Sequence, residues 1–400
     1  MFLPLQGVRV VDLSHVIAGP LASFYLAQLG AEVIKIEPPS GDVMRNAKQE
    51  EGDLPDGFVA LNAGKQSAVH DIRTPEGLAA VRELARGADV FIENLRPGTV
   101  ARYGLGEASL REINPSLVYC SISGYGQQGE WSQRGAYDHV IQALTGMMMM
   151  SGDDPDGPPV KVGFPVIDVA AGVLASMAIM GALTQRARDG CGQTIDASMV
   201  QASLMLMYPN VSAFLSSGVE PRRVGNRGYT GSPTADTYRC CDGWLATAAN
   251  TPAQFRRLAA VLDLSDLCED ERALDLVAFR ADAGFVVARD LPYLRERFNA
   301  AFASRSAADM EERLNAEGVP AARVRSLGEF VREVRDGDKV TMPAWQFAQG
   351  ERRVHTAGLG FHLAASSMQI SRPGAPALGA GAARTKPEPS TSVESVSACD

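Results

Sequence analysis

The first two hundred residues alternate between short β-branched runs and segments that carry helix signals. Strand-like runs stand at 8–13, 31–37, 67–72, 88–95 and 116–122. Pro20 lies in the first turn of the helical segment 18–30. Thr74 and Pro75 are typical first residues of a helix, and Gly87 is a typical end. Strands joined by such helices form right-handed βαβ units with a parallel sheet covered on both faces. The pattern therefore predicts an α/β fold.

A different pattern begins near residue 225. The run 236–249 predicts a hairpin that turns at Asp242-Gly243, and charged amphipathic helices follow it. We therefore expect a smaller α+β domain at 225–325. Residues 380–400 hold few large apolar side chains, so we expect a disordered tail there.

The balance of charge excludes some classes of partner. A formal net charge of -9 argues against binding nucleic acid by phosphate neutralisation. The first residues lack the basic region and apolar core of a signal peptide, so a cytoplasmic location is expected. The apolar stretch 164–183 has the length of a membrane span. Because it contains Pro165 and Asp168, a helix of a soluble enzyme is the better interpretation, with no membrane.

Asp168 is the one ionisable residue of that stretch, and two interpretations of it stay open. Asp is a favoured N-cap, and Asp168 stands just before the run "VAAGVLA". A carboxylate at a helix start in apolar surroundings is also a candidate nucleophile or base. The two roles do not exclude each other.

Other motifs are weaker. "GYGQQG" at 124–129 matches a dinucleotide fingerprint, but polar, turn-like residues follow it instead of a helix and a second strand. His15 ends the first strand, where ligands of α/β sheets bind, and a structural role fits it equally well. Four methionines at 147–150 are either core or a flexible apolar wall for an acyl chain.

Taken together, the ordered motifs of residues 4–380 resemble those of the family III CoA-transferases, which include formyl-CoA and carnitine CoA-transferases. The matching motifs are "VVDLSHVIAGPLASFYLAQLGAEVIKIEPPSGD", "DIRTPEG", "DVFIENLRPGT", "NPSLVYCSISGYGQQG", "GAYDHVIQALTG", "DGPPVKVGFPVIDVAAG", "GQTIDASMVQASL" and "AEGVPAARVRS". Their number and order make the resemblance specific.

The resemblance implies a fold and an assembly. It implies a Rossmann-like large domain of residues 1–215, to which the chain returns at 326–379 after the smaller domain. It also implies a homodimer of two interlocked rings, of which the residue pattern itself gives no hint.

The resemblance also implies a reaction. It makes Asp168 the nucleophile that takes CoA from an acyl-CoA through an anhydride and an aspartyl-CoA thioester and passes it to a free carboxylic acid. No permanently bound cofactor and no metal are implied, since the CoA thioester is itself a substrate. By motif match the CoA-binding residues are Ile17, Ala18, Arg73, Asn94, Leu95, Arg96, Arg102 and Tyr137.

Departures from the family pattern bear on the substrate. The family's α-methylacyl-CoA racemases, the alternative function, carry "GHD" where this chain has Ala136–Asp138. Without that histidine, one of the two groups needed for proton abstraction is missing. Ile17 replaces a glutamine of the oxalate enzyme, so oxalate is disfavoured as acceptor. A small dicarboxylate is expected, with Arg223, Arg227 and Tyr229 as candidates to meet its second carboxylate.

Overall fold

The computed structural model describes residues 2–47, 54–152, 156–228, 232–337, 339–340, 344–361 and 369–381. Its internal contacts divide the chain into two units. The first comprises Met1–Met148, Lys161–Val219 and Met342–Asp400, and the second comprises Met149–Val160 and Glu220–Thr341. The chain thus re-enters the first unit at residue 342, whereas the resemblance implies a return at residue 326. The expected tail lies, from residue 382 onward, outside the described residues.

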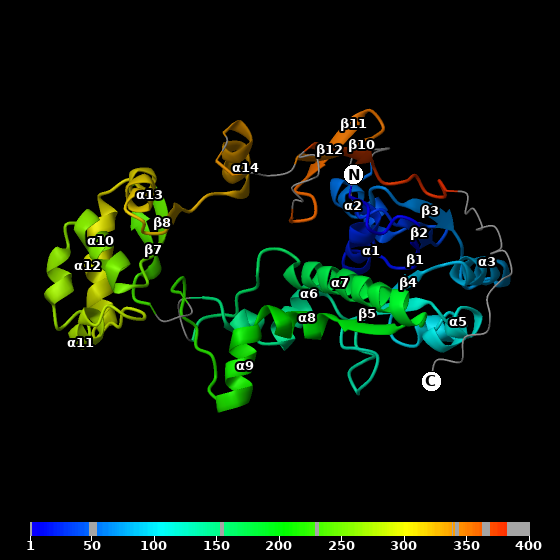
Figure 1. Ribbon diagram of the computed structural model, residues 1–400, viewed down its shortest axis with the longest axis horizontal. Coiled ribbons are helices and arrows are strands. Elements are labelled where there is room, and N and C mark those ends of the chain that lie inside the picture. Colours follow the sequence, from blue (N-terminus) through cyan, green and yellow to red (C-terminus); the bar gives the residue numbers. More distant parts are fainter. Residues whose placement is uncertain are drawn as a thin grey trace. The chain divides into compact units, whose positions relative to one another are not determined.

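A six-stranded parallel sheet forms the centre of the first unit (Figure 1). The strands are β1 (Arg9–Asp12), β2 (Glu32–Glu37), β3 (Gln66–Val69), β4 (Val90–Glu93), β5 (Val118–Ser123) and β6 (Thr194–Ser198). Their order is β3-β2-β1-β4-β5-β6, which confirms the α/β expectation. In this order the chain reverses its direction across the sheet between β1 and β4, and such a point opens a crevice at the carboxyl ends of the strands.

Helices cover both faces of this sheet. The α-helices of the first unit are α1 (Ala18–Gln28), α2 (Asp56–Asn62), α3 (Pro75–Arg86), α4 (Thr99–Arg102), α5 (Glu107–Ile113), α6 (Asp138–Leu144), α7 (Val166–Asp189), α8 (Met199–Leu206) and α9 (Tyr208–Ser217). Val11 of β1 shares a buried cluster with Val81 of α3 and Leu110 of α5. Asp12 faces the other way, toward Ser23 of α1. Because successive strand residues point to opposite faces, α1 and α3 cover different sides.

The apolar stretch around Asp168 forms α7, a helix of 24 residues. Within the described residues it is the one helix long and apolar enough to cross a membrane, and half of its most apolar window is buried. It packs beside α1 and against β5 and β6 (Figure 1). A Cβ at Gly172 would lie 2.7 Å from the Ala18 carbonyl oxygen, so only glycine permits this close approach. These contacts make α7 a packed helix of the first unit.

The returning chain adds a second, small sheet to the first unit. It consists of β10 (Ala344–Gln349), β11 (Arg352–Thr356) and β12 (Gln369–Pro373), in the order β11-β10-β12. Phe347 of β10 lies edge-on to Phe24 of α1, with ring centroids 6.0 Å apart. Residues more than three hundred positions apart in sequence therefore share one core.

The second unit is built on the predicted hairpin. Its strands are β7 (Ala235–Cys240), β8 (Gly243–Ala248) and β9 (Ala321–Arg323), and its helices are α10 (Pro252–Val261), α11 (Leu276–Arg280), α12 (Leu291–Ala303), α13 (Ala307–Ala316) and α14 (Leu327–Asp336). Cys240 pairs with Gly243, so the hairpin turns at Cys241-Asp242, one residue earlier than expected. Asp242 turns back to accept hydrogen bonds from Ser306 Oγ and the Ala307 N–H, both at 2.7 Å.

A buried ion pair closes the end of β1. Lys65 Nζ lies 3.2 Å from Asp12 Oδ2, and neither side chain is exposed. Lys65 also donates to the Pro20 carbonyl and to Asn62 Oδ1, at 2.9 Å each. Burial opposes the charge on Asp12, but Lys65, Lys35 and two serine hydroxyls outweigh it and hold the pKa of Asp12 below its ordinary value. Burial lowers the pKa of Lys65 to about 8.

A second buried pair lies beside the first. Lys35 Nζ contacts Asp42 Oδ2 at 2.9 Å and donates to the Ser14 carbonyl at 2.7 Å. Both pairs therefore hold the segment that leads from β1 into α1. Because every charged group here has partners of opposite sign or hydrogen bonds, the cluster satisfies the rule for buried charge.

Replacing Lys65 tests how much this buried cluster contributes to stability. Lys65→Met leaves the Asp12 carboxylate without its nearest counter-ion, and breaking a buried pair in this way costs about 3–5 kcal/mol. We expect that loss in urea denaturation followed by circular dichroism. Arg86→Met, which removes an exposed partner of Glu83, is the control and should cost less than about 1 kcal/mol. Equal midpoints for the two variants would contradict this role of Lys65.

Candidate active site

A cavity of about 390 Å³ opens at the carboxyl ends of β1, β4 and β5. Its walls come from the segment after β1, the segment after β4, the segment after β5 and the start of α7. Among the residues that line it are His15, Ile17, Ala18, Asn94, Leu95, Arg96, Tyr137 and Asp168. We call it the Asp168 cavity. It lies at the crevice predicted by the strand order.

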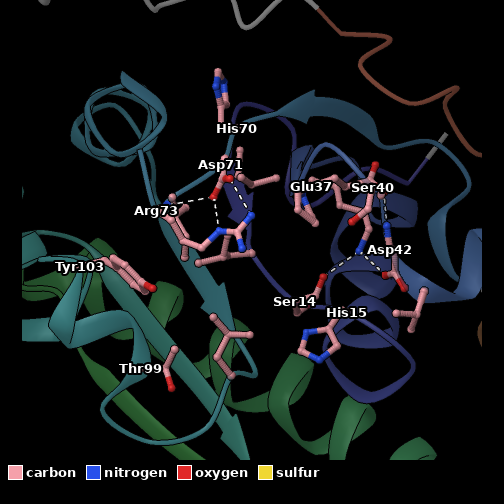
Figure 2. A pocket seen from close by; sticks show the side chains of 18 residues that line it. Ser14, His15, Glu37, Ser40, Asp42, His70, Asp71, Arg73, Thr99 and Tyr103 are labelled. Atoms are coloured by element: carbon pink, nitrogen blue, oxygen red, sulfur yellow. Dashed lines mark hydrogen bonds and ion pairs between the residues drawn. The ribbon is translucent and has the colours of Figure 1, made fainter. Parts of the chain in front are cut away.

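A neighbouring cavity of about 370 Å³ shares His15, Val43 and Leu95 with the first. We call it the Arg73 cavity. Figure 2 shows it between the segments that follow β1, β2 and β3, with Arg73 and Tyr103 on one side and Ser40 and Asp42 on the other. The shared residues make the two cavities neighbours along one wall.

The segment between β1 and α1 has an unusual backbone. Val16 has a φ of 68°, a value that β-branched residues rarely adopt. A Cβ at Gly19 would lie 2.2 Å from the Ser14 Cβ, so the segment folds tightly back on the helix. In the part of the chain described, the N–H groups of Ala18 and Gly19 have no acceptor. The strained turn therefore presents the start of α1, with open donors, at the Asp168 cavity.

Asn94 holds this segment in place. Its side chain accepts from the His15 N–H at 2.9 Å and donates to the His15 carbonyl at 2.8 Å. Both ends of the amide are therefore engaged with backbone. Burial lowers the pKa of His15 and outweighs the opposing charge of Asp42, which favours the neutral form of its imidazole.

Asp168 is the third residue of α7, and the expectation that it caps this helix is wrong. The residue at the N-cap position is Pro165. The capping carboxylate comes from Asp138, whose Oδ2 accepts from the N–H groups of Ile167 at 2.7 Å and Asp168 at 3.0 Å. No described residue donates a hydrogen bond to the Asp168 carboxylate. Burial raises the pKa of Asp168 to about 6, and the neighbouring Asp138 adds to the shift.

Asp138 was given no role by the sequence motifs, although it caps α7 beside Asp168. Gln142, one turn later in α6, donates to Asp138 Oδ1 at 2.6 Å and accepts from the Val162 N–H at 2.9 Å. Asp138 stands beside Tyr137 in a motif we quoted. That it caps a helix thirty residues away is a tertiary contact that no local spacing signals.

Seven of the nine predicted site residues line the Asp168 cavity together; they are Ile17, Ala18, Asn94, Leu95, Arg96, Tyr137 and Asp168. Arg73 lines the Arg73 cavity instead, where it forms a two-point ion pair with Asp71 at 2.7 and 2.8 Å. Arg102 lines neither cavity. Its Nη2 lies 3.5 Å from the hydroxyl of Thr99, and Thr99 lines the Arg73 cavity. Within the described ranges Arg96 forms no ion pair, and Tyr137 is 70% exposed.

The candidates for a second carboxylate differ in their surroundings. Arg223 is buried in the second unit, where it donates to the carbonyls of Gly157 at 2.6 Å and Met149 at 3.2 Å. Its guanidinium thus holds backbone together. Arg227 lines a separate pocket of the second unit with Arg295 and Asn299. Tyr229 lies outside the described residues.

The weaker motifs have structural explanations. Gly126 in "GYGQQG" donates to Ser123 Oγ at 2.9 Å, and the Gln127 N–H donates to Asp196 at 3.0 Å. No helix begins there before α6, so the segment lacks the geometry of a dinucleotide fingerprint. Met147 is buried and Met149 contacts Arg223, and neither lines the two cavities. No group of three or more possible metal ligands occurs among the described residues.

Comparisons with known proteins identify the family of the chain. The family model described as CoA-transferase family III matches residues 5–382. A succinate–glutarate CoA-transferase of Agrobacterium fabrum is 40% identical over 67% of this chain and 69% of its own length. The succinyl-CoA:glutarate CoA-transferase of Homo sapiens is 36% identical over 67% of this chain and 61% of its own length. A solved CAIB/BAIF family protein of Brucella suis is 30% identical, covers 95% of this chain over 97% of its own, and superposes with a TM-score of 0.79.

The position of Asp138 beside Asp168 predicts that replacing Asp138 changes the pKa of Asp168. Asp138→Asn keeps an oxygen that can accept the two N–H groups but removes the negative charge beside Asp168. We therefore expect the pKa of Asp168 to fall from about 6 toward the ordinary 3.8, by roughly one unit. Because a carboxyl is ionised above its pKa, Asp168 in the variant stays ionised at more acidic pH.

Carboxyl ¹³C NMR of the aspartate-labelled protein measures this, with the Asp168 signal identified by its loss in Asp168→Asn. Asp309→Asn, an exposed change on α13, is the control. An Asp168 signal that titrates at the same pH in Asp138→Asn as in the unaltered protein would exclude the proposed effect of Asp138.

Proposed function

The chain belongs to CoA-transferase family III, and from that premise we propose that Asp168 carries CoA covalently between an acyl-CoA donor and a free carboxylic acid. The observation that carries the proposal is the Asp168 carboxylate itself. It is half-buried, lines a cavity, and accepts no hydrogen bond from any described residue. Its neighbour Asp138 caps α7 by accepting from the Asp168 N–H, and the Asp168 side chain takes no part in the cap and is available to react.

The reaction proceeds by acyl transfer in balanced steps. An oxygen of Asp168 attacks the thioester carbon, the C–S bond breaks, and a mixed anhydride and CoA thiolate form. The thiolate attacks the aspartyl carbon of the anhydride, so that the donor acid leaves and an aspartyl-CoA thioester remains. The acceptor carboxylate then attacks this thioester and releases the thiolate. The thiolate finally attacks the acyl carbon of the new anhydride, which gives the product acyl-CoA and restores Asp168.

The start of α1 fits the need of these steps for stabilisation of negative charge. Each tetrahedral intermediate carries an oxyanion, which backbone N–H groups and a helix N-terminus stabilise. The N–H groups of Ala18 and Gly19 have no acceptor among the described residues, and Ala18 lines the cavity that Asp168 lines. We propose that the strained turn at Val16 exists to present them there.

The two cavities together offer room for CoA. We propose that the thioester end lies in the Asp168 cavity and the nucleotide end in the Arg73 cavity, since Leu95 and His15 border both. Arg96 and Arg73 supply positive charge for the phosphates. We propose that Arg102, which lies beyond Thr99, contacts the CoA phosphates that extend past the Arg73 cavity. Tyr137, which is largely exposed, is proposed to cover the acyl end.

A proton-transfer reaction of the racemase type is the second candidate, because His15 lines the same cavity as Asp168. Its neutral imidazole could accept a proton from the carbon next to the thioester. The names of the relatives favour transfer. A succinate–glutarate enzyme and a succinyl-CoA:mesaconate CoA-transferase of Haloarcula marismortui, 35% identical, act on dicarboxylates. We therefore propose a small dicarboxylate as acceptor.

Trapping tests the covalent step. After incubation with succinyl-CoA, the peptide that contains Asp168 should gain the mass of CoA and lose it on treatment with hydroxylamine. Transfer to a panel of glutarate, mesaconate, oxalate and acetate should be detected by mass spectrometry for at least one acid. Asp168→Asn should lower turnover on the order of 10⁴-fold or more, whereas Asp309→Asn should not change it.

The same samples in D₂O, with a 2-methylacyl-CoA, decide between the two candidates. Exchange of the α-proton without transfer to any acid would favour the racemase. Transfer that survives in Asp168→Asn would refute the nucleophile.

We also propose that the chain works as an interlocked homodimer. Val169, Val173 and Met177 are exposed at intervals of four residues along α7, and they are 40%, 36% and 60% exposed. Leu204, Tyr208 and Leu215 of α8 and α9 are exposed as well. A row of large apolar side chains on consecutive helices is typical of a surface that a second copy covers.

Light scattering after size-exclusion chromatography tests this assembly. We expect twice the mass of one chain, and the same mass after dilution to nanomolar concentration, because interlocked rings cannot separate without opening. The double variant Val173→Glu, Met177→Glu should lower the dimer fraction, whereas Arg188→Glu at the end of the same helix should not. A monomer at micromolar concentration would contradict the proposal.

A further inference from the structure

Glu93, the last residue of β4, is a buried carboxyl that the proposed reaction does not use. It is 2% exposed. No described lysine, arginine or histidine pairs with it. Burial raises the pKa of Glu93 to about 7; hydrogen bonds from Ser121 and the Leu95 N–H oppose this shift, and the charge of Asp196 adds to it. Burying a carboxyl without a counter-ion lowers stability unless its hydrogen bonds compensate.

The contacts of Glu93 connect two walls of the cavities. Its Oε2 accepts from the Leu95 N–H at 2.9 Å, and its Oε1 accepts from the Ser121 hydroxyl. Ser121 in turn accepts from Gln127 Nε2 at 2.6 Å. Leu95 belongs to the wall shared by both cavities, and Gln127 belongs to the segment that follows β5.

The sheet register places these groups in one row. Glu93 pairs with Ser121 across β4 and β5, and Ser121 pairs with Asp196 across β5 and β6. The Gln127 N–H donates to Asp196 Oδ2 at 3.0 Å, which closes the row. The other titratable neighbours, Tyr119 and Cys120 of β5, have pKa values raised by burial and are neutral. The Leu95 N–H and the Ser121 hydroxyl both donate to Glu93, so the ionised form of Glu93 satisfies both of them.

We propose that Glu93 is a positioning residue for CoA binding: its carboxylate ties the segment after β4 to the segment after β5 and thereby fixes Leu95 and Arg96 against the ligand. It acts through those residues and touches no substrate itself. The inference rests on the proposed function, because it assumes that this wall binds CoA. A displacement of about 1 Å in such a wall is enough to weaken binding or turnover by roughly 10²-fold.

Three variants separate positioning from folding. Glu93→Met keeps the length of the side chain but accepts no hydrogen bond, so the Leu95 segment loses its tie. Glu93→Gln retains an oxygen for the Leu95 N–H and an amide for Ser121, and serves as the conservative rescue. Ser121→Ala removes only the link to β5. Because Glu93→Met also removes a buried unpaired carboxyl, its thermal midpoint should stay within a few degrees of the unaltered protein.

The experiment measures CoA binding by calorimetry, the KM and kcat with succinyl-CoA and glutarate, and hydrogen exchange of peptides that span 94–97. We expect Glu93→Met to raise the Kd for CoA and the KM at least tenfold, to change kcat less than threefold, and to speed exchange at 94–97. Glu93→Gln should remain within about threefold of the unaltered protein in all values, with Ser121→Ala between the two. Unchanged Kd and unchanged exchange in Glu93→Met would overturn the inference. So would a loss of kcat with KM unaltered.

Failure of the proposed function has a different signature. If the unaltered protein binds no CoA, the proposal for the cavities fails, and the positioning role of Glu93 fails with it. Faster exchange at 94–97 in Glu93→Met would then show the tie to be structural only. CoA binding by the unaltered protein that Glu93→Met leaves intact overturns the inference about Glu93 alone.

Discussion

The carboxylate of Asp12 accepts hydrogen bonds from Ser23 Oγ and the Ser14 N–H and faces the buried ammonium of Lys65. This cluster lies where β1 ends, so it determines how the chain turns into α1. Lys65, which follows β2 and α2 in the chain, donates to the Pro20 carbonyl. Asn94, which follows β4, accepts from the His15 N–H. The strained turn at Val16 persists because contacts from three other segments determine it. The open N–H groups at the start of α1, on which the proposed chemistry depends, are a consequence of that turn.

The two carboxyl groups near the start of α7, those of Asp138 and Asp168, have different roles because their contacts differ. Asp138 accepts a hydrogen bond from Gln142 and caps the start of α7, so its negative charge stabilises that helix. Asp168 is the third residue of α7 and lies beside that charge, and no described residue donates a hydrogen bond to its carboxylate. Burial and the neighbouring charge both favour its protonated form, which keeps its pKa near 6. A carboxylate with such a pKa is ionised at neutral pH and is a better nucleophile than an ordinary one, because the reactivity of a nucleophile rises with its basicity.

Local sequence signals predicted the helices and the parallel sheet well. They did not predict contacts between residues far apart in the chain. Thr74, Pro75 and Gly87 bound α3 as their helix preferences indicate, and the alternation of runs gave the parallel sheet. The capping role of Asp168 was wrong, because the cap comes from Asp138, thirty residues earlier, and such a partner has no local signature. Glu93 lies inside the predicted strand 88–95 and no role was predicted for it, because its contacts arise from register with Ser121 on the next strand. Motif resemblance brought seven site residues to one cavity because those motifs follow strands that end at the same edge of the sheet.

The central claim is that Asp168 exchanges an oxygen with the substrate acids, and an isotope measurement tests it directly. The enzyme is given succinyl-CoA and a glutarate whose carboxylates carry ¹⁸O, for a single turnover, and the peptide that contains Asp168 is analysed by mass spectrometry. In the proposed sequence the acceptor oxygen bridges the second anhydride and stays with the aspartate when the thiolate attacks the acyl carbon. One ¹⁸O should therefore appear on Asp168 for each turnover. Labelled glutaryl-CoA formed without ¹⁸O in the protein would contradict the account.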